Sequence, residues 1–143
     1  MILVDANVLL YAVNRDAKHH AAALAWLDAA LGAGEGVGFP WTVLLAFLRL
    51  STNPAVFAAP LTEEQAAQCV EGWLAQPAAV VVSPTSRHLG ILRGLLHDAG
   101  TAANLVNDAH LAALAVEHSA RIASFDRDFR RFEGVRLLVP GNS

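Results

Sequence analysis

The chain has 143 residues, a length typical of one domain, and 55% of them are hydrophobic while 16% are charged, which excludes intrinsic disorder and predicts a single domain over residues 1–143. The formal net charge of −3 excludes a protein that holds nucleic acid by bulk positive charge alone. The longest strongly apolar stretch without a charge, residues 36–48, is too short to span a membrane, and the single cysteine, Cys69, excludes an internal disulfide. We therefore expect a cytoplasmic protein with no membrane contact.

Strands and helices alternate along the first half of the chain. Residues 2–4 form a continuous apolar run that predicts a short strand buried on both faces. Apolar residues at helical spacing predict a helix over residues 20–31. Residues 36–39 are expected to form a second strand, and Pro40 suits the first turn of a helix that runs to about Ser51.

The same alternation continues through the middle of the chain. Thr62 and Gln65 have the spacing of a capping box, which predicts that a helix begins there. Residues 79–82 are a run rich in β-branched side chains and favour another buried strand. Leucines at helical spacing then predict a helix over residues 89–99 that ends at a glycine.

The last third of the chain predicts one more helix and two more strands. Asn107 is expected to cap a helix that carries Asp108 in its first turn. Residues 121–125 and 135–139 are predicted to be strands, with a short helix over 127–132 between them. Short buried strands that alternate with helices predict a three-layer α/β fold with a mostly parallel central sheet flanked by helices.

Acidic side chains fall where the predicted strands end. Asp5 follows the first strand, Asp126 follows the strand over residues 121–125, and Asp128 comes two residues later. Because the carboxyl ends of parallel strands meet at one edge of a sheet, these acids and Asp108 could gather there. Close carboxylates raise one another's pKa unless a cation neutralises them, and oxygen ligands suit Mg²⁺ or Mn²⁺. The pattern predicts a metal site of the kind used in phosphoryl chemistry.

Each acid also has a purely structural interpretation. Asp5 and Asp126 could cap the helices that follow them, and Asp108 could interact favourably with a helix dipole. Capping alone does not require the capped ends to gather at one edge of the sheet. Their joint placement therefore favours the metal site.

Four segments of the chain share a pattern with a known family, and the resemblance extends over essentially the whole chain. They resemble the PIN domain, and more closely the VapC-type toxins of bacterial toxin–antitoxin pairs. The resemblance implies a PIN-like fold, a homodimer, a VapB-type antitoxin as partner, and a Mg²⁺-dependent endoribonuclease, with Mn²⁺ as a possible substitute. It implies that cleavage of tRNA or ribosomal RNA inhibits translation. The segments are Leu3–Leu10, Pro40–Pro54, Asn107–Ala115 and Ser124–Phe129.

The resemblance also assigns roles to individual residues. The family commonly has a glutamate three residues before the arginine of its second segment, and here Ala46 stands three residues before Arg49. Three interpretations stay open: Asp128 compensates, which we favour; only one metal binds well; or the protein is a catalytically weak or inactive module that binds RNA or protein. The implied catalytic residues are Asp5, Asp108 and Asp126, the implied metal ligands are these three with Asp128, and the implied supporting residues are Asn7 and Ser124.

Basic residues and histidines near the acids have two interpretations each. Arg127 and Arg130 lie beside the acidic pair and are expected to bind RNA phosphates, although they could form a solvated face. Arg49 could form an internal salt bridge or take part in the site. His110 could be a catalytic base, but it follows Asp108 by two residues, so we expect it to point to another side of the helix as a structural residue outside the site.

Overall fold

Five short strands form one parallel sheet in the computed structural model, which describes residues 1–142. The central strand is buried on both faces, and Leu3 and Val4 have no exposed surface. The predicted α/β fold with a parallel sheet is confirmed. In spatial order the strands are β3 (Ala79–Val82), β2 (Val37–Pro40), β1 (Ile2–Val4), β4 (Arg121–Ala123) and β5 (Leu137–Leu138).

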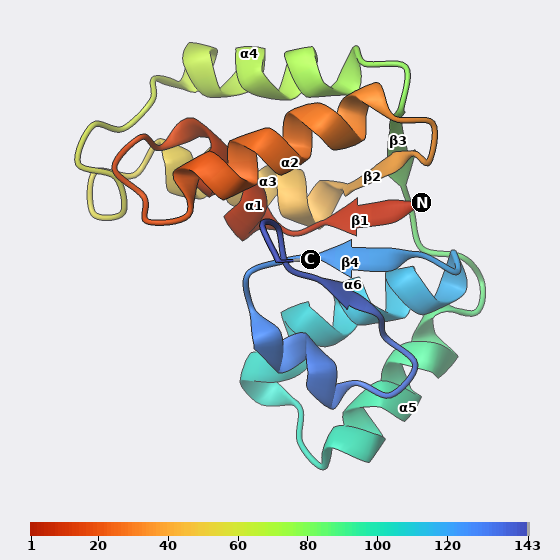
Figure 1. Cartoon of the computed structure of the whole chain (residues 1–143). Helices are drawn as coiled ribbons and strands as arrows, with labels where there is room; N and C mark the ends of the chain where they lie inside the picture. The colour runs from red at the N-terminus through yellow and green to blue at the C-terminus, as the bar shows by residue number, and fades with distance from the viewer. Residues whose placement is uncertain (143) are drawn as a thin grey trace.

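Helices connect the strands and form two groups, one on each side of β1 and β4 (Figure 1). The first group packs together around α1 and α3, and in the second group α5 packs on α6. The first group is α1 (Ala6–Val13), α2 (His20–Gly32), α3 (Trp41–Ser51) and α4 (Glu63–Leu74), and the second is α5 (His88–Ala99) and α6 (Val106–Glu117) with the 3₁₀ turns η1 (Ala103–Leu105) and η2 (Arg127–Arg131).

Local hydrogen bonds explain where several of these helices begin and end. The Asp5 carboxylate accepts from the Ala6 amide at the start of α1. Thr62 and Gln65 form the predicted capping box at the start of α4. Helix α5 ends at Gly100, whose φ of 75° lies in the left-handed region that glycine adopts without strain.

Three sequence-based predictions are wrong in detail. The strand over 79–82 is not buried, because β3 lies at the edge of the sheet, and Val80 and Val81 are 45% and 46% exposed. Asn107 does not cap α6, because η1 runs directly into a helix that begins at Val106. The strands near the carboxyl end of the chain are also shorter than predicted, since β4 and β5 pair over only a few residues.

An aromatic cluster fixes the position of α3 relative to the sheet. The Trp73 ring of α4 meets the edge of the Phe47 ring of α3 at a centroid distance of 4.9 Å and stacks on Phe39 of β2 at 6.4 Å. Phe39 and Phe47 are completely buried. The cluster therefore holds α3 and α4 together against β2.

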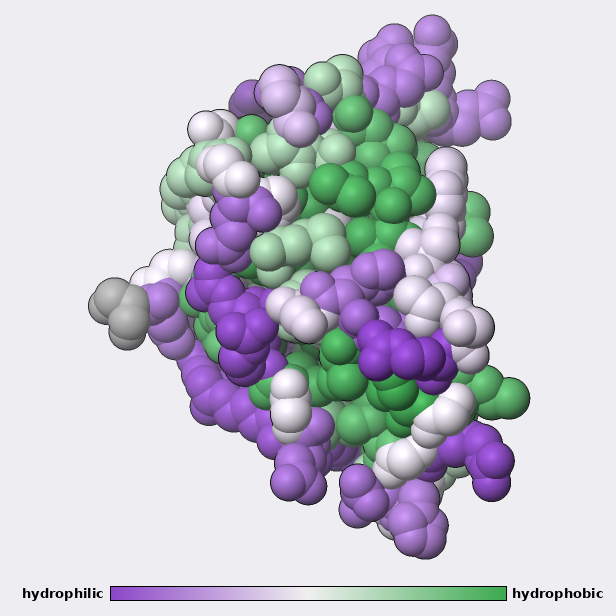
Figure 2. All heavy atoms as spheres, turned by 90° about the vertical axis from the view of Figure 1, so that its right-hand side faces the viewer, coloured by the Kyte–Doolittle hydropathy of each residue, from purple (hydrophilic) through white to green (hydrophobic). Residues whose placement is uncertain are grey.

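The side of the molecule at which the strands begin carries many apolar side chains (Figure 2). It contains a hollow of about 260 Å³ that includes Trp26 and Val37, and the Glu35–Arg121 ion pair lies beside it. Among residues 1–142, no helix is long and apolar enough to cross a membrane.

The position of Gly38 in β2 gives a test of this packing. A Cβ there would collide with the Leu3 side chain and lie 2.8 Å from a Val82 methyl group, and Leu3 is completely buried. We expect Gly38→Ala to lower the free energy of unfolding by about 1–3 kcal/mol, measured by urea denaturation. The matched control is Gly72→Ala in α4, where a Cβ meets nothing within 4 Å. That control should be neutral or stabilising, and an equal loss in both variants would contradict the close packing at β2.

Candidate functional site

The candidate site lies at the point where the order of the strands in the sheet reverses. The chain builds the sheet outward from β1 through β2 to β3, and then returns to place β4 on the other side of β1. In open parallel sheets, ligands bind at the carboxyl ends of the strands on either side of such a point. Asp5 directly follows β1, and Asp126 follows β4 after Ser124 and Phe125.

A compact hydrogen-bond network joins these two strand ends. The Ser124 hydroxyl donates to Asp5 Oδ2 at 2.7 Å, and the same oxygen atom of Ser124 accepts from the Asp126 amide at 3.0 Å. The Asn7 side chain donates to Ser124 Oγ at 3.0 Å and to Asp5 Oδ2 at 3.3 Å, and it accepts from the Phe125 amide at 3.1 Å. Ser124 has no exposed surface. Asn7 and Ser124 therefore hold the Asp5 carboxylate in one orientation.

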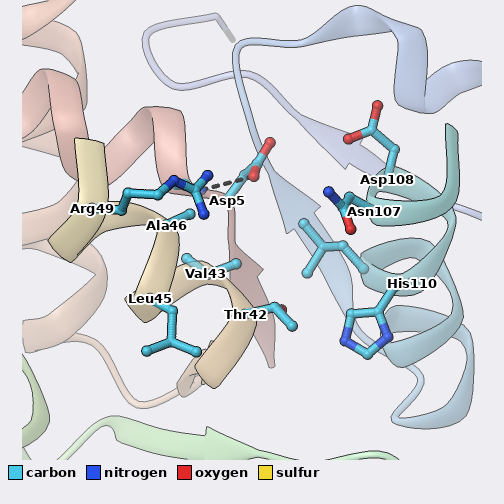
Figure 3. A pocket seen from close by; sticks show the side chains of 11 residues that line it. Asp5, Thr42, Val43, Leu45, Ala46, Arg49, Asn107, Asp108 and His110 are labelled. Atoms are coloured by element: carbon cyan, nitrogen blue, oxygen red, sulfur yellow. Dashed lines mark hydrogen bonds between the residues drawn. The ribbon is translucent and has the colours of Figure 1, made fainter. Parts of the chain in front are cut away.

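A cavity of about 290 Å³ opens between α3 and α6 beside this network (Figure 3). Asp5 lies at its base, Asp108 lines the α6 wall, and Ala46 and Arg49 line the α3 wall. Within residues 1–142 the Arg49 guanidinium forms no ion pair, so of its two interpretations the internal salt bridge is absent there.

Burial and neighbouring carboxylates shift the pKa values of the acids in the cavity. The pKa of Asp108 is raised to about 6, first by burial and then by repulsion from Asp126, Asp5 and Asp128. Burial also raises the pKa of Asp5, although the hydrogen bond from Ser124 opposes that shift. Asp108 therefore experiences the negative charge of all three other acids.

The four acids differ in how far they enter the cavity. Asp126 accepts from the Asp128 amide at 2.9 Å and so begins η2. The Asp128 side chain is 70% exposed and lies 3.7 Å from the Arg131 guanidinium. In the part of the chain that the structure describes, no three acidic, histidine or cysteine side chains are close enough to share a metal ion. Asp5 and Asp108 therefore line the cavity, whereas Asp126 and Asp128 are not among its lining residues, and the four acids do not form a closed ligand set.

The basic residues predicted to bind RNA lie on the exposed surface of η2. Arg127 and Arg130 are exposed, and neither forms an ion pair in the described residues. Arg127 also lines a second cavity of about 330 Å³, next to the Phe125 ring, which stacks on the His19 ring at 4.6 Å. Two cations near the acids are thus available to a negatively charged ligand.

The sequence predicts that His110 points to another side of α6 from Asp108, and the structure differs from that expectation. His110 lines the same cavity as Asp108 (Figure 3). Its Nδ1 atom lies 2.9 Å from Nε2 of His88, whose Nδ1 atom hydrogen-bonds Glu117 Oε2. The sequence carries one signal for this arrangement, because His110 and Glu117 are seven residues apart and so share one face of α6. The partner His88 lies on α5 and could not be identified from local spacing.

The environment of this histidine pair also shifts pKa values. Burial lowers the pKa of His110, and the neighbouring His88 lowers it further. Burial alone would raise the pKa of Glu117, but hydrogen bonds from Thr85 and His88 outweigh it and hold that pKa below its ordinary value. Glu117 is therefore a buried carboxylate whose charge is balanced by hydrogen bonds.

Comparison with known proteins supports one family for this arrangement. The PIN domain family matches residues 2–135. Over 140 residues the chain is 60% identical to Ribonuclease VapC37 of Mycobacterium tuberculosis, and the alignment covers 98% of this chain and 97% of the relative. It is 41% identical to Ribonuclease VapC31 of the same species, with 98% and 99% covered.

A solved structure shows the same fold at low sequence identity. The structure of VapBC2 from Rickettsia felis bound to a DNA fragment from their promoter aligns with a TM-score of 0.71 at 18% identity. The alignment covers 96% of this chain and 98% of that chain. The family match and the 60% identical relative show that the chain belongs to the PIN domain family and, within it, to the VapC ribonucleases.

Proposed function

We propose that this protein is a VapC-type toxin that hydrolyses phosphodiester bonds in tRNA or ribosomal RNA and so inhibits translation. The observation that carries the proposal is the acidic cavity at the sheet's switch point, in a chain 60% identical to a named ribonuclease. Asp5 is oriented there by Ser124, and Asp108 has a pKa raised to about 6. A carboxylate cluster of this kind is destabilising by itself and gains from a bound cation.

The residues present fit a divalent metal ion. The ligand atoms available from Asp5, Asp108 and Asp126 are all carboxylate oxygens, which Mg²⁺ and Mn²⁺ prefer. Because the three side chains are not at shared ligand distance, binding requires Asp108 and Asp126 to rotate toward the Asp5 carboxylate, which its hydrogen bonds hold in place. When bound, such an ion polarises the phosphodiester and lowers the pKa of its water.

Ala46 reduces the number of acids that the α3 wall can supply. It lines the cavity where the related proteins of the family commonly carry a glutamate, and an alanine offers no ligand atom. We propose that Asp128 compensates, because its charge already reaches Asp108 and its exposed side chain is held, among the described residues, only by the 3.7 Å ion pair with Arg131. Water can replace a missing protein ligand of Mg²⁺.

Other residues of the site would orient the Asp5 carboxylate and bind the RNA. Asn7 and Ser124 hold the Asp5 carboxylate so that it cannot rotate away from the cavity. Arg127 and Arg130 would bind phosphates of the RNA, because both are exposed cations near the acids and neither forms an ion pair within residues 1–142. Their charge offsets the repulsion between RNA and the carboxylates.

We also propose a homodimer and a VapB-type antitoxin as partners, in the cytoplasm. Two observations support protein partners. The solved structures with this fold include proteins named VapBC. Large apolar side chains are exposed on α3 and on the edge strand β3, among them Trp41, Leu45 and Val81.

A second function is favoured by one observation. Position 46 lines the cavity with an alanine and not with an acid, which favours a catalytically weak or inactive module that acts by binding RNA or protein. The cleavage experiment below separates the two functions.

Neutralising one acid of the cavity should abolish cleavage. We expect purified protein with Mg²⁺ or Mn²⁺ to cut total tRNA or ribosomal RNA, and we expect EDTA to stop it. Asp5→Asn should lower the cleavage rate by at least about a hundredfold at unchanged fold, because it removes the charge at nearly constant shape. The measurement is denaturing gel electrophoresis of the RNA with time, with circular dichroism to check folding.

The matched control is Asp28→Asn on the exposed surface of α2, which should cut as well as the wild type. Full activity of Asp5→Asn would refute the assignment of the cavity. No cutting by the wild type with either metal would favour the binding module instead.

Removing the charge of Asp108 should stabilise the metal-free protein at neutral pH. Because the folded-state pKa is raised from 3.8 to about 6, the folded protein loses stability as the pH rises between these values. We expect the free energy of unfolding of Asp108→Asn to exceed that of the wild type by about 1 kcal/mol at pH 7 in EDTA, after allowance for solvent screening. At pH 4 the two should differ little. A difference that is largest at pH 4, measured by urea denaturation, would contradict repulsion among the acids.

Restoring a carboxylate on the α3 wall should strengthen metal binding. We expect Ala46→Glu to bind Mn²⁺ about tenfold more tightly than the wild type, because it adds an oxygen ligand that faces the cavity. Isothermal titration calorimetry without RNA measures this directly. The control is Ala25→Glu, an equal change of charge on the exposed surface of α2. Equal affinities in the two variants would show that Ala46 does not face the metal.

A further inference from the structure

A buried carboxylate is connected through two histidines to the cavity. The Glu117 side chain has no exposed surface, and burying a charge is costly unless hydrogen bonds compensate it. Its Oε1 atom accepts from the amide and the hydroxyl of Thr85, and its Oε2 atom is bound by His88. None of the acids proposed to bind metal takes part in this network.

The network leaves the His110 ring one free polar atom. An ionised carboxylate only accepts hydrogen bonds, so Nδ1 of His88 must donate to Glu117. Nε2 of His88 then meets Nδ1 of His110 at 2.9 Å. The remaining atom, Nε2 of His110, is therefore available to a ligand, and its ring projects from α6 into the cavity (Figure 3).

We propose that Nε2 of His110 hydrogen-bonds a ribose 2′-hydroxyl of RNA held in the cavity, with His88 and Glu117 as positioning residues. The proposal rests on the proposed function, because it places RNA at the same site. A fixed imidazole that lines the same cavity as Asp5 and Asp108 gives the cavity a contact that DNA cannot make, since the 2′-hydroxyl is the group that distinguishes RNA from DNA.

The hydroxyl fits this position better than a phosphate oxygen. A hydroxyl both donates and accepts, so it pairs with Nε2 whether or not that nitrogen carries hydrogen. A phosphate oxygen pairs only with an N–H group, and Arg127 and Arg130 already offer such groups at η2. The wall formed by α6 therefore contacts the sugar, while the phosphates lie toward the arginines.

The test compares two fluorescein-labelled hairpins that have the same RNA stem and loop sequence. The loop sugars are ribose in one hairpin and deoxyribose in the other, and binding is measured by fluorescence anisotropy in EDTA to prevent cleavage. We expect the wild type to bind the ribose loop about tenfold more tightly, which is the scale of one hydrogen bond. In His110→Ala this ratio should fall to near one, and in His110→Gln, which keeps a hydrogen-bonding side chain, it should be partly retained.

Two further variants separate a contact with RNA from a purely structural role. His97→Ala changes an exposed histidine of α5 and should keep the full ratio. Glu117→Gln should lower the ratio, because the His110 ring is then held less firmly, in a protein that circular dichroism shows to be folded. If the network only joins α5 to α6, Glu117→Gln and His110→Ala will lower the melting temperature and leave the ratio unchanged, which overturns the proposal.

The wild type distinguishes this proposal from the proposed function. A wild type that cleaves RNA with Mn²⁺ but binds both loops equally refutes the ribose contact and leaves the ribonuclease intact. A wild type that prefers the ribose loop but never cleaves supports the contact and favours the binding module.

Discussion

The parallel pairing of β1 with β4 is the constraint on which the site depends. In this register Val4 lies opposite Ala123, so the residues that follow the two strands emerge side by side. The Ser124 hydroxyl can then bind Asp5 and the Asp126 amide together. This pairing joins segments more than a hundred residues apart, and without it the acids would belong to unrelated helix ends.

The same arrangement concentrates negative charge, and repulsion among these acids destabilises the folded protein. Repulsion contributes to the raised pKa of Asp108, while three hydrogen bonds stabilise the Asp5 carboxylate. Functional sites commonly retain destabilising arrangements of this kind because activity needs them. Ala46 adds no charge to the α3 wall of the cavity and so does not add to this repulsion.

The two walls of the cavity are held by different kinds of interaction. The α3 wall is fixed by apolar packing of Phe47 against Trp73, which is insensitive to pH and salt. The α6 wall is fixed to α5 by hydrogen bonds that end at the buried Glu117 carboxylate. Directional hydrogen bonds orient a side chain more strictly than packing does, which suits His110 to contacting a ligand. The cavity thus has one wall that apolar packing holds in place and one that hydrogen bonds hold in place.

The sequence by itself determined the features that depend on residues a few positions apart. The capping box of Thr62 with Gln65, the Asp5 cap and the alternation of strands with helices all follow from local spacing, as does the placement of acids after strands. Only the tertiary structure decided which elements become neighbours. It placed β3 at the edge of the sheet, so Val80 and Val81 are exposed despite their apolar run. It also brought His88 to His110, because burial and long-range hydrogen bonds depend on packing between helices and not on spacing along one of them.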